Sequence, residues 1–112
     1  MEIRDNEKIC IFTPLSPILN KYETERLFKN VNSEKQREIG IDLSYVSDCT
    51  IDFVTKLKEF TPKLKIGIFN IPSDVFVIFN VMNVDKCVKL YASELDFETD
   101  KHRIVNRHFS VI

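Results

Sequence analysis

The fold is decided by the stretch EIGIDLSYVSDCTIDFVTKLKEFTPKLKIGIFNI, residues 38–71. Its two ends, Glu38 to Leu43 and Lys63 to Ile71, alternate apolar with small or polar residues, which is the pattern of β-strands. Between them, apolar residues recur at every third position from Ile51 to Phe60 and predict an amphipathic helix. Thr61-Pro62 ends that helix, because the residue before a proline avoids the helical conformation. Strand, helix and strand in this order predict a parallel pair with a crossover helix.

Further elements continue this alternation on both sides. A nearly continuous apolar run from Lys8 to Leu15 predicts a strand buried on both faces. An imperfect amphipathic pattern predicts a helix from about Asn20 to Gln36, with Ser16-Pro17 as its start signal. A second start signal, Pro72-Ser73-Asp74, begins a helix that runs to Met82, and Cys87 to Tyr91 is typical of a last short strand.

We therefore predict an α/β fold: a four- to five-stranded, mostly parallel mixed sheet with helices packed mainly on one face. The chain has 112 residues and is expected to form a single domain over residues 1–112, because this length leaves no room for a second core. Residues 93–112 are expected to be a C-terminal tail or edge element. Its apolar residues, from Arg103 to Ile112, suit an edge strand or a docked tail.

Composition argues against several classes of function. Sixteen basic and 17 acidic residues give a net charge of -1, which argues against a general nucleic-acid binder. The only glycines, Gly40 and Gly67, cannot build the glycine-rich loops that hold nucleotide phosphates. Cys10, Cys49 and Cys87 lack the paired spacing of zinc and redox motifs. No apolar run approaches the ~20 residues of a membrane span, so we expect a cytoplasmic protein that is not membrane-embedded.

Four segments together resemble a STAS domain, the small α/β module of bacterial anti-sigma-factor antagonists and of some transporter tails. Ile41 to Ser47 (IDLSYVS) is similar to the family's strand ending in Asp-Leu-Ser, and a helix follows after a short loop. Lys65 to Val75 (KIGIFNIPSDV) is similar to a strand, an Asn and a proline-containing turn into the next helix. Val81 to Ser93 (VMNVDKCVKLYAS) looks like the family's end of helix, turn and strand reaching a Tyr. The likeness spans about residues 8–97 and implies a non-enzymatic protein-protein interaction domain of signalling and transcription regulation.

The chain departs from this family where the helix begins after the Asp-Leu-Ser strand. Many members have Asp-Ser-Ser-Gly or Asp-Ser-Thr-Gly there, and a partner kinase phosphorylates the first Ser. Counted without a gap from Asp42, the acceptor position falls on Ile51 and the glycine on Phe53. With two residues deleted, the acceptor falls on Cys49 and the glycine on Ile51. We favour the ungapped alignment; in both alignments the serine and the glycine are absent.

Switching by phosphorylation of the usual serine is therefore not expected. A phosphate at a helix N-terminus meets free amide groups and the helix dipole, and it adds about two negative charges to the surface. Thr50 and Ser47 are the remaining candidate phosphorylation sites, although hydroxyl groups at a helix start more commonly act as caps.

The resemblance implies that a partner docks on the loop and helix start. The residues concerned are Ser47, Asp48, Cys49, Thr50, Asp52 and Phe53. The implied partner is an anti-sigma factor or a kinase-like regulatory protein. The alternative is the ATPase of a membrane ABC transporter of the lipid-export type, with this chain as a soluble accessory subunit, because such relatives bind without needing the serine. A homodimer is a further alternative.

Other chemistry has less support. Cys49, at a helix N-terminus, is the one cysteine whose thiol is expected to have a lowered pKa, so the rival from another class is a cysteine-dependent enzyme. No histidine stands at an identifiable spacing to activate this thiol. Asp42, Asp48 and Asp52 match no calcium loop. We therefore predict no catalytic residue, no metal and no cofactor.

The helix that ends at Met82 is apolar nearly all round from Val75 onward. Two interpretations remain open. It is either a core helix partly covered by the C-terminal tail, or an exposed apolar patch that binds a partner or a second copy.

Overall fold

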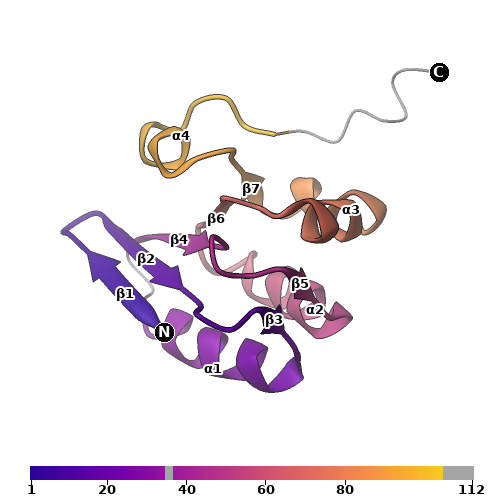
Figure 1. The fold of residues 1–112 in the computed structure, drawn as a ribbon. Helices are drawn as coiled ribbons and strands as arrows, with labels where there is room; N and C mark the ends of the chain where they lie inside the picture. The colour runs from indigo at the N-terminus through magenta and orange to yellow at the C-terminus, as the bar shows by residue number, and fades with distance from the viewer. Residues whose placement is uncertain (35–36, 105–112) are drawn as a thin grey trace.

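The structure, a computed structural model, describes residues 1–34 and 37–104. Its main feature is a mixed five-stranded sheet (Figure 1). The strands, in spatial order, are β1 (Glu2–Asp5), β2 (Ile9–Thr13), β4 (Glu38–Asp42), β6 (Ile66–Phe69) and β7 (Lys89–Leu90). β1 is antiparallel to β2, whereas every other neighbouring pair is parallel. A separate pair of short parallel strands consists of β3 (Ile18–Leu19) and β5 (Asp48–Cys49).

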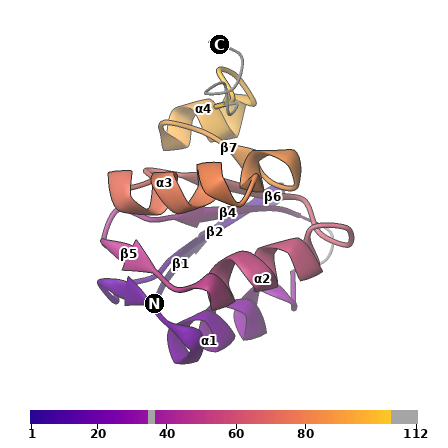
Figure 2. The ribbon, with the colours of Figure 1, turned by 90° about the vertical axis from the view of Figure 1, so that its right-hand side faces the viewer.

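Helices connect the parallel strands and cover the sheet. They are α1 (Lys21–Val31), α2 (Ile51–Phe60), α3 (Ser73–Val81) and the short α4 (Glu94–Thr99), with a 3-10 turn η1 (Val84–Lys86) after α3. Figure 2 shows α4 on the opposite side of the sheet from α1 and α2. The sheet therefore has two unlike faces, which we call the three-helix face, covered by α1, α2 and α3, and the α4 face.

The three-helix face carries the larger core. Inward side chains of the strands, such as Ile39 and Ile41, are fully buried there together with side chains from the three helices. The Phe53 ring of α2 lies at the centre, with its centroid 6.1 Å from that of Phe28 on α1 and 6.1 Å from that of Phe79 on α3. These three rings join the helices to one another as well as to the sheet.

The α4 face is organised around Phe97. Its ring stacks on Phe69 at 5.3 Å between centroids and meets Tyr91 edge-on at 5.8 Å. Gly40 and Gly67 lie under it as cross-strand partners in β4 and β6. A Cβ atom would lie 2.7 Å from the Phe97 ring at Gly40 and 2.6 Å from it at Gly67. The Phe97 ring thus packs directly against the two glycines of the chain.

The central predictions are confirmed. The α/β class and the mostly parallel mixed sheet with helices mainly on one face are as expected. β2, β4 and β6 lie within the strands predicted from their apolar patterns, and α2 covers the predicted range. α3 begins at Ser73 as its start signal predicts, because Pro72 precedes it in an extended conformation.

Several peripheral predictions were wrong. β1 was not predicted, because all four of its residues are exposed and no apolar alternation marks it. Ser16-Pro17 does not start α1; it leads into β3, and Asn20 caps the helix by accepting a hydrogen bond from the Glu23 amide at 2.9 Å. The helix also ends earlier, at Val31.

The C-terminal segment differs from a plain tail. α4 forms within it, with the Ser93 hydroxyl accepting a hydrogen bond from the Asp96 amide at 3.2 Å. Ile104 forms an isolated antiparallel bridge with Leu90. The predicted edge strand or docked tail covers residues 103–112, of which 105–112 lie outside the described residues.

Candidate functional site

The segment before α2 is fastened to the chain that follows β2. The amides of Ser47 and Asp48 both donate to the carbonyl oxygen of Pro17, at 2.7 and 3.2 Å, and the Thr50 amide donates to that of Leu19 at 3.0 Å. These bonds extend the β3–β5 pairing up to the first turn of the helix. The start of α2 is therefore held in one position on the molecular surface.

Thr50 is the N-cap residue of α2, but its side chain does not cap the helix. The hydroxyl donates instead to the Asp52 carboxylate at 2.9 Å, with the Leu19 carbonyl oxygen a second acceptor at 3.3 Å. Thr50 therefore occupies the expected N-cap position, but its hydroxyl does not form the capping hydrogen bond. A phosphate on this hydroxyl would lie beside the Asp52 carboxylate and be repelled by it.

The structure separates the six residues of the implied docking site into two groups. Ser47 and Asp48 are exposed, and Thr50 and Asp52 are partly exposed. Cys49 and Phe53 are buried in the three-helix core at 6% and 0% exposure. Direct contact with a partner is therefore expected only from the first group.

The expectation of a lowered pKa for Cys49 was wrong. Burial of the thiol, with a smaller contribution from the Asp48 carboxylate, raises the pKa to about 11. A helix N-terminus lowers a thiol pKa only when the thiolate points at free amides in a solvated environment, and this side chain packs into the core instead. The Cys49 thiol is thus mainly protonated at neutral pH.

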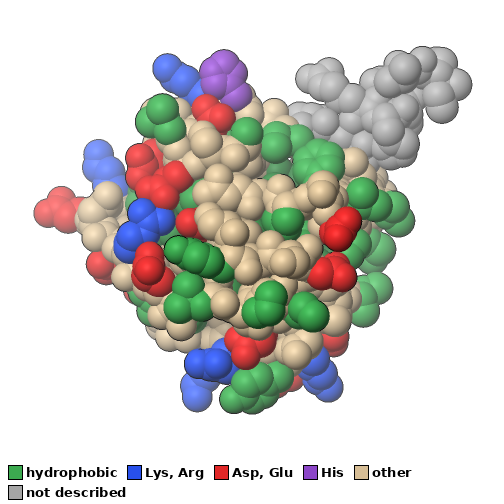
Figure 3. All heavy atoms as spheres, in the orientation of Figure 1, with side chains coloured by type: hydrophobic (Ala, Val, Ile, Leu, Met, Phe, Trp, Pro, Cys, Tyr) green, Lys and Arg blue, Asp and Glu red, His purple; other side chains and the backbone are tan. Residues whose placement is uncertain are grey.

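Exposed apolar side chains without an assigned role occur at the start of α2 and on α3. Ile51, the first residue of α2, is 62% exposed. α3 contacts β5, and its Val77 and Val81, one turn apart, are 59% and 72% exposed while Val75 and Phe79 face the core. Figure 3 shows hydrophobic side chains gathered along the right-hand edge of the molecule, where α3 lies in Figure 1. We call Ile51, Val77 and Val81 the exposed apolar residues.

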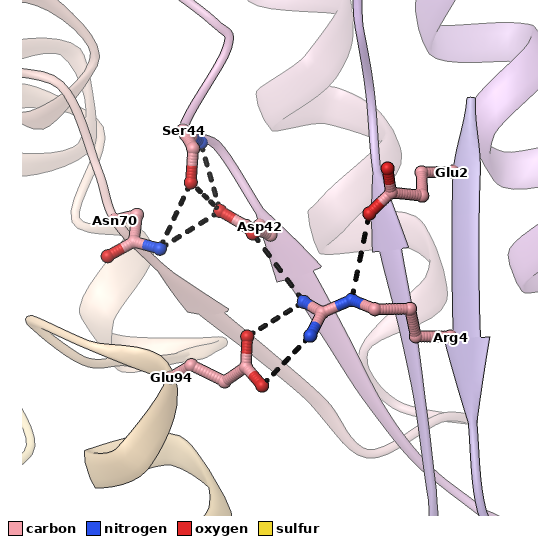
Figure 4. Close-up of polar contacts among 6 residues, drawn as sticks. All are labelled: Glu2, Arg4, Asp42, Ser44, Asn70 and Glu94. Atoms are coloured by element: carbon pink, nitrogen blue, oxygen red, sulfur yellow. Dashed lines mark hydrogen bonds and ion pairs between the residues drawn. The ribbon is translucent and has the colours of Figure 1, made fainter.

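A polar cluster that the sequence reasoning missed lies at the carboxyl ends of β4 and β6 (Figure 4). The Asp42 carboxylate accepts hydrogen bonds from the Ser44 amide at 3.0 Å, from the Ser44 hydroxyl, and from the Asn70 amide group at 3.0 Å. Arg4 approaches it at 3.7 Å and pairs with both oxygens of Glu94 at 2.7 and 3.1 Å. The Glu94 hydrogen bond raises the pKa of Arg4.

The hydrogen bonds of this cluster connect two loops, and they do not leave the Asp42 carboxylate free to bind a ligand. Asp42 is 7% exposed and is satisfied by three donors, which tie the loop after β4 to Asn70 after β6. Asn70 has a φ of 55°, a left-handed conformation that Asn tolerates better than most residues. The signal that would have revealed the cluster is an Asp and an Asn directly after neighbouring buried parallel strands, since such strand ends meet at one edge of the sheet.

The acidic residues considered as a cation site do not come together. Asp42 is committed to Ser44 and Asn70, Asp48 accepts from the Cys49 amide at 2.8 Å, and Asp52 accepts from Thr50. Over residues 1–34 and 37–104, no three His, Cys, Asp or Glu side chains are arranged to hold a metal ion. In that same part of the chain, no helix has the length and apolar character that crossing a bilayer requires.

No protein-family model and no curated protein matches this chain.

Proposed function

We propose that this chain is a STAS-like interaction domain that binds a regulatory protein through the start of α2 and the outward side of α3. The observation that carries the proposal is Ile51, a large apolar side chain that is 62% exposed in the first turn of a rigidly fastened helix. Exposed apolar residues on an ordered surface gain free energy when a partner covers them.

The positions of the STAS-like motifs support this proposal. The Asp-Leu-Ser motif begins at Asp42, the last residue of β4, and leads through β5 to α2. The Asn and proline of the second motif, Asn70 and Pro72, join β6 to α3. Ser44 and Asn70 both bind Asp42, so the two motifs are neighbours in space, and the segments that lead into α2 and α3 both start from this cluster.

Regulation by the family's serine is not part of the proposal, since Ile51 carries no hydroxyl at the aligned position. Ser47 is the better of the two remaining acceptors, because it is exposed whereas the Thr50 hydroxyl is bound to Asp52. The partner we propose is an anti-sigma factor with a kinase-like fold. A transporter ATPase is the alternative, favoured by the same missing serine.

Affinity purification from the native cell tests this proposal if three forms of the chain are compared. Ile51→Asp places a charge in the docking surface, and Tyr22→Asp is the matched control on α1, where Tyr22 is 65% exposed. We expect one protein to be retained by the wild type and the control but lost from Ile51→Asp. A kinase-like anti-sigma factor supports the main proposal, and an ATPase supports the alternative. Equal retention of all bound proteins by the three forms contradicts both.

The cysteine-enzyme hypothesis has its own test. With a raised pKa, the Cys49 thiol is expected to react with iodoacetamide at neutral pH more slowly than the exposed Cys87. Mass spectrometry of the labelled peptides measures both rates. Faster labelling of Cys49 than of Cys87 would revive the enzyme hypothesis.

A further inference from the structure

Within residues 1–34 and 37–104, no strand pairs with the outer edge of β1. Among the described residues β1 pairs only with β2, and Figure 1 shows it at the outside of the sheet. Its sequence is Glu2-Ile3-Arg4-Asp5, and all four residues are exposed. A free strand edge offers backbone donors and acceptors to any strand that meets it in register.

The register within the β1–β2 hairpin identifies which backbone groups face outward. The Asn6 amide donates to the Ile9 carbonyl oxygen at 2.9 Å, so Asn6 and Ile9 are a hydrogen-bonded pair. Hydrogen-bonded and non-hydrogen-bonded pairs alternate along an antiparallel ladder. Arg4 and Glu2 therefore direct their amide and carbonyl groups toward β2, whereas Ile3 and Asp5 direct theirs toward solvent.

We infer that β1 pairs antiparallel with β1 of a second copy of this chain, about a two-fold axis at Ile3, so that the two sheets become continuous. In this register, Ile3 lies opposite Ile3 of the second copy and the two residues exchange two backbone hydrogen bonds. Glu2 then lies opposite Arg4 of the second copy, and Arg4 opposite its Glu2. Both charges stand on the α4 face, where each strand already carries a Glu2–Arg4 contact at 3.8 Å.

Charge selects this register over its neighbours. Within β1 only Ile3 and Asp5 have backbone groups that face outward. The axis can therefore lie at Ile3, at Asp5, or at Arg4 between them, where Ile3 would pair with Asp5 of the second copy. An axis at Arg4 would place two arginines opposite each other, and an axis at Asp5 would place two aspartates together. Like charges directly opposite in a sheet are destabilising, whereas opposite charges and apolar pairs are favourable.

Apolar surface beside the axis favours the same partner. On the three-helix side, Ile3 is 49% exposed and Leu15 53% exposed. They line, with Met1, a groove of about 340 Å³ between β1 and α1. The arrival of a second Ile3 at the axis would cover part of this surface in both copies. Since the interface is short, we expect a weak dimer with a dissociation constant of about 10–100 μM.

Sedimentation equilibrium of the purified chain and three variants tests the inference. Ile3→Pro removes the outward-facing amide together with the isoleucine side chain at the axis, and Glu2→Lys places a lysine opposite Arg4 of the second copy. Each is expected to raise the dimer dissociation constant at least tenfold. Glu7→Lys makes the same charge change in the hairpin turn and should leave the dissociation constant unchanged. Circular dichroism identifies any variant that fails to fold, in which case the other variant decides.

Cross-linking tests the register itself. In a Cys87→Ser background, Ile3→Cys is expected to form an intermolecular disulfide under mild oxidation, because the two Cα atoms would be about 5.5 Å apart. Asp5→Cys is the control, since its copies would lie about 14 Å apart. A monomer at about 1 mM, a dimer that survives both Ile3→Pro and Glu2→Lys, or equal cross-linking at the two positions would overturn the inference. The docking proposal concerns other surfaces and would stand or fall separately.

Discussion

The two faces of the sheet are stabilised in different ways. On the three-helix face, 22 buried hydrophobic residues of the described chain form one cluster, and three phenylalanine rings join the helices. On the α4 face, the corresponding cluster contains four residues and depends on Phe97 above Gly40 and Gly67. The first face distributes its packing over many contacts, whereas the second depends on the fit of one ring.

Polar contacts complete the attachment of α4 at both ends. Arg4 binds Glu94 at the first residue of the helix, and the Tyr91 hydroxyl donates to the Asp100 carboxylate just beyond the last. The pKa of Asp100 is lowered mainly by this hydrogen bond. Exposed ion pairs contribute little free energy. The packing of the Phe97 ring on Gly40 and Gly67 is therefore expected to be the main interaction that holds α4 on the sheet. We therefore expect the three-helix core to unfold with the whole domain and α4 to detach from the sheet on its own.

Phe53→Ala is expected to have the largest effect. Removing a fully buried ring that contacts both Phe28 and Phe79 should lower the free energy of unfolding by about 3–5 kcal/mol, through lost burial and the cavity left behind. Urea denaturation followed by circular dichroism measures this change. Val77→Ala, at a 59% exposed position of α3, should cost less than about 0.5 kcal/mol. A loss below about 1 kcal/mol for Phe53→Ala would mean that the three-helix core is not cooperative.

Phe97→Ala is expected to cost less, about 2–3 kcal/mol, because α4 can leave the sheet instead of enclosing a cavity. Hydrogen exchange should show loss of protection in α4 while α1 and α2 keep theirs. Leu95→Ala is the matched control, since this side chain is 67% exposed on the same helix. Equal loss of protection in all helices would show instead that the two faces unfold as one unit.

Gly67→Ala tests the close contact between residue 67 of β6 and the Phe97 ring. The added Cβ would lie 2.6 Å from Phe97 and 3.2 Å from Tyr91, so we expect a loss of about 1–2 kcal/mol in the free energy of unfolding. In the Phe97→Ala background the same substitution should cost nearly nothing. A double-mutant cycle measured by urea denaturation gives the coupling. Additive effects would contradict direct contact between the ring and residue 67.

Alkaline pH is expected to act on both faces, with the smallest effect. The pKa of Cys49 is raised from 9.0 to about 11, and burial also raises the pKa of Tyr91. Between pH 9 and 11 the unfolded chain releases the Cys49 proton while the folded chain retains it, so the free energy of unfolding falls as pH rises through this range. Cys49→Ala should flatten that slope in urea titrations at several pH values and leave the Tyr91 part. A slope unchanged by the substitution would exclude Cys49 as its source.

The parts of the fold that could be predicted are those with strong periodicity. β4, β6 and α2 follow from apolar spacing and from the Thr61-Pro62 stop, because burial selects the residue types along a strand or helix. β1 could not be predicted, since an exposed edge strand need not carry an apolar pattern. α4 has a single buried residue, Phe97, and one residue sets no period.

The candidate site also has a part that the sequence could locate and a part that only packing decides. The loop and helix start from Ser47 to Phe53 could be located along the chain, but the exposure of Ile51 and the burial of Cys49 depend on how α2 packs against the sheet and α3. The Asp42 cluster draws its members from four separate segments, with 90 residues between Arg4 and Glu94. No local pattern could bring them together.

The sequence by itself determined the order of the central elements β2, α1, β4, α2, β6, α3 and β7 and the scarcity of glycine, because both depend only on which residue types follow one another. The tertiary structure alone decided that Gly40 and Gly67 face each other under Phe97 and that Cys49 is a buried thiol with a raised pKa. It also decided that β1 pairs, among the described residues, with β2 alone. The physical reason is that close approach, desolvation and strand pairing depend on distances between residues far apart in the chain.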